Sequence, residues 1–86
     1  MNKRGIDYKT LSFVLRGKRR KVVLLCLDKP KIPKQTAFEC KLSTSNVARA
    51  LKELVGRGLV KCINPKDRAF KFYESTKKGE KIKGQL

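Results

Sequence analysis

Hydrophobic residues recur at helical spacing over residues 43–57, and this stretch predicts the central helix of the fold. Ser43 or Thr44 can begin it, because Ser and Thr side chains accept hydrogen bonds from the free amides of a first turn. Gly56 and Gly58 can end it, since glycine adopts the left-handed conformation that closes a helix. The apolar stripe consists of Val47, Ala50, Leu51, Leu54 and Val55. The opposite face carries Ser45, Asn46, Arg49, Lys52 and Glu53.

A shorter helix is predicted over residues 33–41, with a tight turn before the central helix. Pro33 is tolerated at a first helical position. We expect Ala37, Phe38 and Cys40 to point inward. The two segments together indicate a helix-turn-helix, and short polar and cationic side chains on its second helix are of the kind that read base edges.

Two further helices are predicted nearer the start of the chain. The first begins after Asp7 and stops at Gly17, with apolar residues at Tyr8, Leu11, Val14 and Leu15. Residues 22–27 are six consecutive apolar residues, for which periodicity alone does not separate strand from helix. We favour a buried helix over residues 18–28, because Pro30 ends it and a helix-turn-helix follows. Such a helix must be covered on more than one face, and a second subunit could supply part of that cover.

The second half of the chain reads as a hairpin followed by a short closing helix. Strands are expected over residues 59–64 and 69–75, with turn chemistry at residues 65–68. Ile32 could add a minimal third strand. With Val60, Cys62 and Tyr73 inward, Phe70 and Phe72 would point outward together and suggest a partner surface. The closing helix is expected from Thr76 onward.

These elements predict a mainly α fold with a small β-hairpin, an α+β class. We expect about four helices, a short C-terminal helix and a two- to three-stranded hairpin in one domain over residues 1–86. Residues 1–6 and 84–86 are expected to fray.

The net charge of the chain suggests the kind of molecule that it binds. The chain has 23 Lys and Arg against 7 Asp and Glu, a net +16, and such a charge repels itself in a compact state. A polyanion is the usual reason, nucleic acid before an anionic membrane; a lysine-rich surface kept for solubility is the plainer alternative. The basic run Lys18–Lys21 could bind phosphate or merely be a solvated helix start.

Several classes are disfavoured. No run approaches the ~20 apolar residues that span a bilayer, and no signal-type core follows the N-terminus, so we expect a cytoplasmic protein without membrane contact. Cys26, Cys40 and Cys62 lack zinc-site spacing and no histidine is present, so no metal and no cofactor is expected. We read the cysteines as small buried hydrophobes, with a disulfide as the alternative in a hyperthermophile. No nucleophile–base pair or phosphate-cradling loop indicates an enzyme.

The order of elements is that of a winged helix, in which the hairpin is the wing. Four segments carry a closer resemblance to archaeal winged helix-turn-helix transcriptional regulators, distantly MarR-like: residues 27–33, 42–54, 58–60 and 73–79. The resemblance covers roughly residues 11–84. It implies sequence-preferring binding of double-stranded DNA, commonly as a dimer, with the second helix of the pair in the major groove.

The resemblance assigns roles by position. Thr44, Ser45, Asn46 and Arg49 match the base-reading part of the recognition helix, and Lys52 suits a phosphate contact. Lys66, Arg68 and Lys71 match the basic wing, which spans residues 64–71. Helix capping is the plainer role for Thr44 and Ser45, and Asn46 could support the cap or contact adenine. Arg49 could be a solvated arginine.

The sequence also departs from the family pattern. Ala69 stands where the second Arg of the Asp-x-Arg wing pattern belongs, and Ile32 stands where a Thr cap is common. A homodimer through the first helix and the 22–27 run is expected by analogy of fold. The alternatives are an RNA-binding or ribosome-associated winged helix, whose Phe70 and Phe72 would stack bases, and a protein-interaction module.

Overall fold

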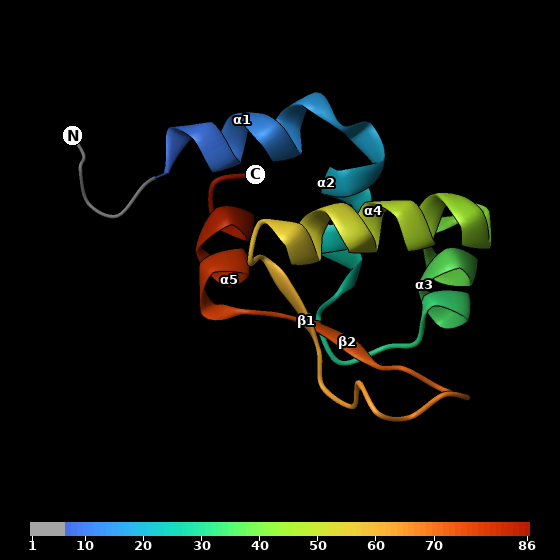
Figure 1. The fold of residues 1–86 in the computed structure, drawn as a ribbon. Helices are drawn as coiled ribbons and strands as arrows, with labels where there is room; N and C mark the ends of the chain where they lie inside the picture. The colour runs from blue at the N-terminus through green and yellow to red at the C-terminus, as the bar shows by residue number, and fades with distance from the viewer. Residues whose placement is uncertain (1–6) are drawn as a thin grey trace.

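Five helices and one antiparallel hairpin make up the described part of the chain (Figure 1). The computed structural model describes residues 7–86, so the expectation of a frayed start over residues 1–6 lies outside it. In chain order the elements are α1 (Tyr8–Arg16), α2 (Lys18–Cys26), α3 (Pro33–Cys40), α4 (Thr44–Gly56), β1 (Val60–Cys62), β2 (Tyr73–Ser75) and α5 (Lys77–Lys83). The predicted class, mainly helical with a small hairpin, is confirmed.

Helix α1 begins and ends where the sequence indicates. The Asp7 carboxylate accepts hydrogen bonds from the Thr10 amide at 3.1 Å and from the Thr10 hydroxyl at 2.6 Å. Gly17 follows the last turn. Val14 is fully buried, whereas Tyr8 is 65% exposed. Helix α1 therefore packs on the core through one face and leaves the other open.

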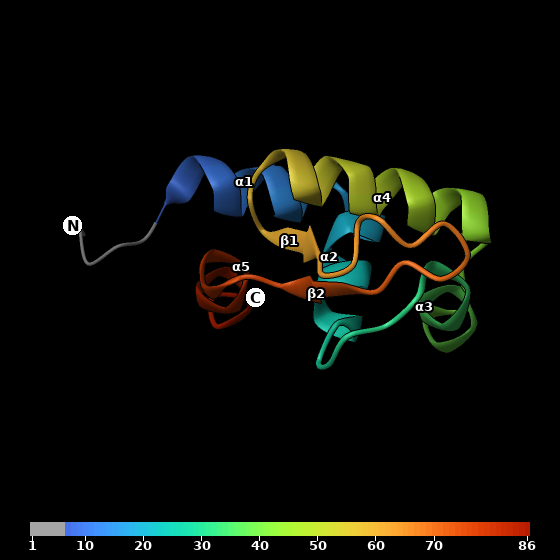
Figure 2. The ribbon, with the colours of Figure 1, turned by 60° about the horizontal axis from the view of Figure 1, so that its bottom comes forward.

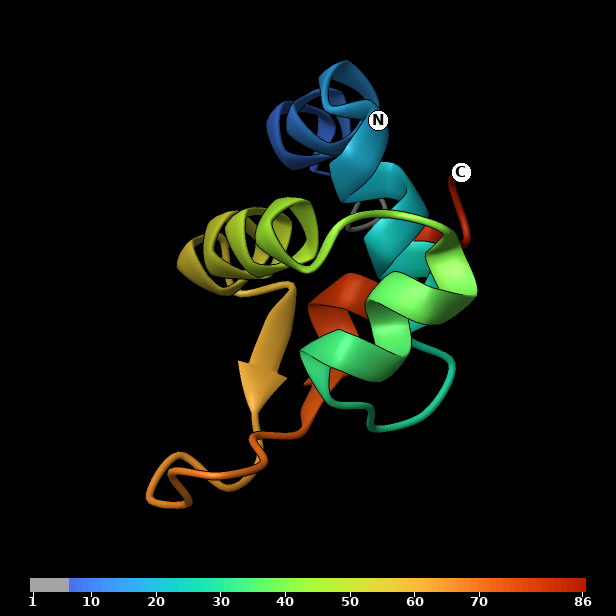
Figure 3. The same cartoon turned by 90° about the vertical axis from the view of Figure 1, so that its right-hand side faces the viewer.

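Helix α2 is the buried helix that the apolar run predicts. It contacts α1, α3, α4 and α5, and Figure 3 shows it at the centre of the helices. Val23 and Leu24 have no exposed surface, and Leu27 follows just after the helix with 1% exposed. Leu25, however, is 46% exposed. The cover of α2 by the described residues 7–86 is therefore incomplete on one side.

Helices α3 and α4 form the expected helix-turn-helix. Pro33 is the first residue of α3, and Lys41 closes that helix in the left-handed conformation. Ser43 caps α4, with its hydroxyl accepting from the Asn46 amide at 3.1 Å. The stripe of α4 is buried at Val47, Ala50, Leu51 and Leu54, while Val55 is 42% exposed.

The expectation that Phe38 points inward is wrong. Phe38 is 85% exposed, and Thr36 is the buried residue beside Ala37. In a helix, residues 36, 37 and 40 share one face, so residue 38 falls on the opposite one. Thr36 tolerates burial because its hydroxyl donates to the Ile32 carbonyl at 3.1 Å.

The hairpin is shorter than predicted. Its register pairs Val60 with Ser75, Lys61 with Glu74 and Cys62 with Tyr73. Beyond Cys62 one more backbone bond joins the Ile63 amide to the Phe72 carbonyl. The Asn64 side chain then takes over, because its NH2 group donates to the Phe70 carbonyl and its oxygen accepts from the Phe72 amide. The minimal third strand exists as a single bridge from Lys31 to Tyr73, one residue before the expected Ile32.

The connection from α4 to the hairpin depends on glycine. Gly58 has φ +74°, which glycine adopts without steric cost. The following Leu59 is fully buried and its amide donates to the Leu54 carbonyl at 3.0 Å. After the hairpin, Thr76 caps α5, with its hydroxyl accepting from the Gly79 amide. Ile82 returns α5 to the core, and Leu86 packs partly buried against it.

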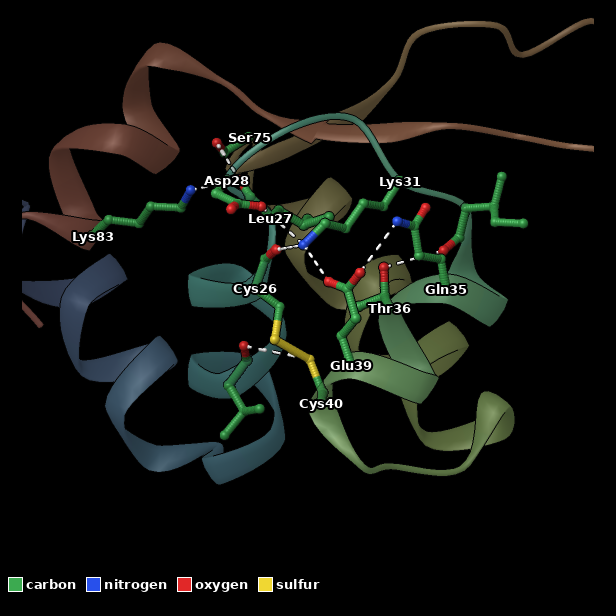
Figure 4. A network of polar contacts seen from close by, with 12 residues as sticks. Cys26, Leu27, Asp28, Lys31, Gln35, Thr36, Glu39, Cys40, Ser75 and Lys83 are labelled. Carbon is green, nitrogen blue, oxygen red and sulfur yellow. Dashed lines mark hydrogen bonds and ion pairs between the residues drawn. A yellow bond between two sulfur atoms is a disulfide. The ribbon is translucent and has the colours of Figure 1, made fainter.

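Cys26 and Cys40 form a disulfide, which corrects the expectation that they serve as small buried hydrophobes and agrees with the alternative (Figure 4). The bond joins α2 to α3. Their Cα atoms lie 6.7 Å apart, within the span that a disulfide bridges. Two cysteines separated by 14 residues carry no local signal of pairing, so only the packing of the two helices shows it. Cys62 is free and half-buried.

Candidate nucleic-acid interface

The exposed face of α4 presents four of the five residues predicted for the recognition helix. Thr44, Ser45, Arg49 and Lys52 are all exposed. The buried stripe fixes this outcome, because residues 45, 49 and 52 lie on the side of the helix away from Val47, Leu51 and Leu54. The face is therefore polar, cationic and free of the protein core.

Asn46 differs from its predicted partners. It is half-buried, and it borders a hollow of about 680 Å³ between the α1–α2 corner and α4. Its amide also donates to the cap hydroxyl of Ser43. The structure thus places Asn46 on the flank of α4 rather than with Ser45 and Lys52.

The same hollow is lined by cationic side chains from two helices, α2 and α4. Lys18 and Arg19 at the start of α2 are exposed, and both line the hollow together with Arg49 of α4. Glu53 is the acidic residue at its edge. Part of the basic run at residues 18–21 is therefore brought next to the recognition helix, which its position in the sequence does not show.

Arg20 of that run is not free, because it is tied to three groups. Its Nε donates to the Glu53 carboxylate at 2.9 Å, and an NH group donates to the Phe13 carbonyl at 2.7 Å. The guanidinium carbon also lies 3.9 Å from the centre of the Phe13 ring, a cation–π contact. The bond from Arg20 lowers the pKa of the Glu53 carboxyl. Arg20 thereby compensates the acidic charge that α4 carries on its polar side.

The wing is a basic loop held by its own polar side chains. Lys66, Arg68 and Lys71 are exposed. Asp67 accepts from the Ala69 amide at 2.9 Å and from the Phe70 amide at 3.0 Å, which lowers the pKa of its carboxyl. Asp67 thus braces the loop backbone, and Arg68 is left to solvent.

Helix α4 and the wing lie on one side of the molecule. Figure 3 shows both on the same side, with α3 on the other, and Figure 2 shows the wing loop extending toward the end of the molecule where α4 begins. A groove lined by Lys52 of α4 and by Cys62 and Tyr73 of the hairpin separates them. The two predicted contact regions can therefore meet one partner together.

A second polar network supports the helix-turn-helix from behind. Lys31 is 4% exposed, and its ammonium lies 2.8 Å from Asp28, 2.6 Å from Glu39 and 2.5 Å from the Cys26 carbonyl (Figure 4). Burial lowers the pKa of Lys31, but the bonds to Asp28 and Glu39 outweigh it and the net shift is upward. Together with the disulfide, this network holds α3 against α2.

Sequence reasoning missed the roles of Arg20 and Lys31. Glu53 was the available signal for the role of Arg20. An acidic residue on the polar face of a predicted DNA-reading helix would repel phosphate unless a cationic side chain paired with it. Lys31 lies between two prolines and gave no such signal. Within residues 7–86, no group of three or more His, Cys, Asp or Glu side chains is placed to hold a metal ion. No helix in that range has the length and apolarity to cross a membrane.

No protein-family model and no curated protein matches the chain, whereas solved structures do. It is similar to the transcriptional regulator SlyA, with a TM-score of 0.71 and 26% identity over 94% of this chain and 57% of that one. The fold is a winged helix-turn-helix. A MarR family transcription regulator matches with a TM-score of 0.74 and 20% identity, over 90% of this chain and 55% of that one.

A third winged-helix match is the homodimeric winged helix-turn-helix DNA-binding domain Mb0332 from Mycobacterium bovis, described as a possible ArsR-family transcriptional regulator. Its TM-score is 0.68 at 18% identity, over 91% of this chain and 69% of that one. The neighbours of this winged helix are thus transcription regulators of MarR and ArsR type. The chain spans little more than half the length of SlyA and of the MarR family structure.

Proposed function

We propose that this protein is a transcriptional regulator that binds double-stranded DNA with a sequence preference. The observation that carries the proposal is the shared side of α4 and the wing, where Ser45, Arg49 and Lys52 stand exposed beside a basic loop. The net charge of +16 supplies the attraction to phosphate. The similarity to winged-helix transcription regulators agrees with it.

In this proposal α4 enters the major groove. Arg49 donates two hydrogen bonds to a guanine edge, a contact worth ~1–3 kcal/mol of discrimination. Thr44 and Ser45, exposed in the first turn, reach base edges or the adjoining backbone. Asn46 lies on the flank, so it contacts adenine only at the border of the site. Lys52 faces the groove toward the wing and meets phosphate.

The wing and the start of α2 extend the contact on both sides of α4. Lys66, Arg68 and Lys71 bind backbone or the minor groove. Lys18 and Arg19, which border the hollow beside Arg49, bind phosphate on the other side. Base reading is thus concentrated in α4, while affinity is spread over both flanks.

Two copies binding together fit this proposal. Tyr8 and Leu15 on α1 are 65% and 50% exposed, and Leu25 on α2 is 46% exposed. These are the two segments, the first helix and residues 22–27, that the sequence suggests for a homodimer, and Mb0332 is described as homodimeric. Sedimentation of the protein at high concentration tests it, and a strictly monomeric species rejects this interface. An archaeal source stays a prediction from the resemblance.

Selection of bound sequences from a random duplex pool tests the proposed function. We expect one enriched motif, with two-fold symmetry if two copies bind. The logarithm of the binding constant should fall linearly with the logarithm of the salt concentration, with a slope of about −0.9 per neutralised phosphate. A pool without enrichment together with a shallow slope overturns the proposal. Competition with structured RNA decides against the RNA-binding alternative if duplex DNA is preferred.

A further inference from the structure

The wing carries more apolar surface than a phosphate contact needs. Phe70 is 59% exposed, Ile63 46% and Phe72 37%. Ile63 and Phe72 lie across the hairpin from each other, joined by a bond from the Ile63 amide to the Phe72 carbonyl at 2.9 Å. The loop that bears them projects away from the helices (Figure 3). An exposed aromatic on a projecting loop is available to a partner.

The backbone around Phe70 is fixed by two polar side chains. Its amide donates to Asp67 at 3.0 Å and its carbonyl accepts from the Asn64 side-chain amide at 2.7 Å. The other side-chain atom of Asn64 accepts from the Phe72 amide at 2.7 Å. The peptide groups on both sides of the ring are therefore paired within the loop. A fixed backbone reduces the entropy lost when the ring enters a binding site.

The charges around Phe70 identify the chemistry of the partner. Lys66, Arg68 and Lys71 are exposed in the same loop. Asp67 is the acidic residue of residues 63–72, and its carboxylate is already bonded to two backbone amides. An aromatic ring surrounded by cations fits a polyanion that also offers flat apolar faces. Nucleic-acid bases between phosphates have both properties.

We propose that Phe70 is a wedge that enters the minor groove and inserts between two stacked base pairs, bending the duplex. This inference rests on the proposed function and deepens it. Apolar side chains that unstack a base step kink the duplex toward the major groove. Pyrimidine–purine steps unstack most easily, so Phe70 adds a preference for such a step at the wing without any hydrogen bond to a base. Lys66, Arg68 and Lys71 hold the phosphates that flank it.

The test uses the full chain and the duplex selected from the random pool. 2-Aminopurine is placed at each base step in turn, and dyes at the duplex ends report bending by energy transfer. With the unsubstituted protein, we expect a fluorescence rise at one step under the wing and a shortened end-to-end distance. Phe70→Ala should abolish both signals while binding persists at reduced affinity. Phe70→Leu, which keeps an apolar wedge, should retain part of each.

Phe38→Ala is the matched control, because Phe38 is an exposed aromatic on α3 outside the wing. It should leave both signals unchanged. If the unsubstituted protein does not bind duplex DNA, the proposed function itself fails. If it binds but no step brightens and the duplex stays straight, the wedge is wrong and the function stands. If Phe70→Ala leaves the DNA signals intact but lowers the sedimentation coefficient, the ring belongs to a protein interface, which also overturns the wedge.

Discussion

Arg20 of α2 and Glu53 of α4 form an ion pair at 2.9 Å beside the face proposed to read DNA. Their side chains are 24% and 37% exposed, so the pair is partly screened by solvent. Arg20 is held there by the Phe13 carbonyl and by the Phe13 ring, over which Arg57 also lies at 4.1 Å. The pair joins the α1–α2 corner to the recognition helix and offsets an acidic charge that would oppose phosphate.

Replacing Arg20 tests both roles of this pair. Arg20→Met keeps an apolar stem but loses the bond to the Phe13 carbonyl, and a hydrogen bond from a charged donor contributes about 1.5–3 kcal/mol. We expect a lower free energy of unfolding in urea and weaker DNA binding, because Glu53 loses its partner. Adding Glu53→Gln should restore binding but not stability. Arg19→Met, on the exposed neighbour, should leave stability unchanged; equal destabilisation by both would show that the Arg20 contacts are not special.

Arg49 and Arg68 should differ in what they contribute to binding. Arg49→Ala should relax sequence preference, with a loss of ~1–3 kcal/mol on the selected duplex and little on a scrambled one. Arg68→Ala should weaken binding to both duplexes alike. It should also make the dependence of affinity on salt shallower, by the amount expected for about one phosphate contact. Binding isotherms on the two duplexes measure this. Equal losses on both duplexes for Arg49→Ala would remove its reading role.

The Lys31 network predicts a loss of stability in acid. Bonds from Lys31 hold the pKa of Asp28 below 3.8 and that of Glu39 below 4.5. The unfolded chain therefore takes up protons first as the pH falls, and stability present above about pH 4.5 is lost through the lower folded pKa values. Urea midpoints measured from pH 7 to pH 2 should therefore decrease once the pH drops below about 4.5. Glu39→Gln should flatten the decline; an unchanged profile would mean that other carboxyls dominate.

The disulfide between Cys26 and Cys40 should stabilise the fold. It closes a loop with a sequence separation of 14, for which chain entropy gives about 3 kcal/mol. We expect reductant or Cys40→Ser to lower the free energy of unfolding by up to that amount. Cys62→Ser is the control, because Cys62 is free. If reductant changes neither the mass nor the stability of the isolated protein, the bond is not formed under those conditions.

Gly79 should tolerate no side chain. A Cβ there would overlap the backbone carbonyl oxygen of buried Leu59. A backbone atom in the core cannot swing aside as the end of a flexible side chain can. Gly79→Ala should therefore cause a marked fall in the thermal midpoint, since α5 must move off the core. Gly56→Ala, where nothing lies within 4 Å, should instead gain roughly 0.5–1 kcal/mol from helix propensity. Similar midpoints for the two variants would contradict this contact.

Much of the architecture follows from local pattern. Asp7 and Ser43 each cap the helix that the sequence assigns to them, and Gly58 has the left-handed conformation expected after α4. These features depend on neighbouring residues, so periodicity and capping chemistry suffice to predict them. Phe70 and Phe72 are exposed as expected, although β2 begins only at Tyr73, so bonds to Asp67 and Asn64 rather than strand alternation hold the backbone there.

The errors and omissions involve contacts distant in sequence. Phe38 was expected inside because it is apolar, yet the packing of α3 buries Thr36 in its place, beside the expected Ala37. Helical spacing defines a face but not which face meets the rest of the protein. Asn46 was grouped with Ser45 and Arg49, yet it is half-buried while both of those residues are exposed.

By itself, the sequence determined the order of helices and strands, the polar face of α4 and the cationic character of the wing. These properties depend on the spacing of residues along one element and on their formal charge. The tertiary structure alone decided the partners: Arg20 with Glu53, Lys31 with Glu39, and Cys26 with Cys40. The two members of each pair lie in different parts of the chain. Ion pairs and disulfides form only at short distance, so these pairs exist only after packing has brought those parts together.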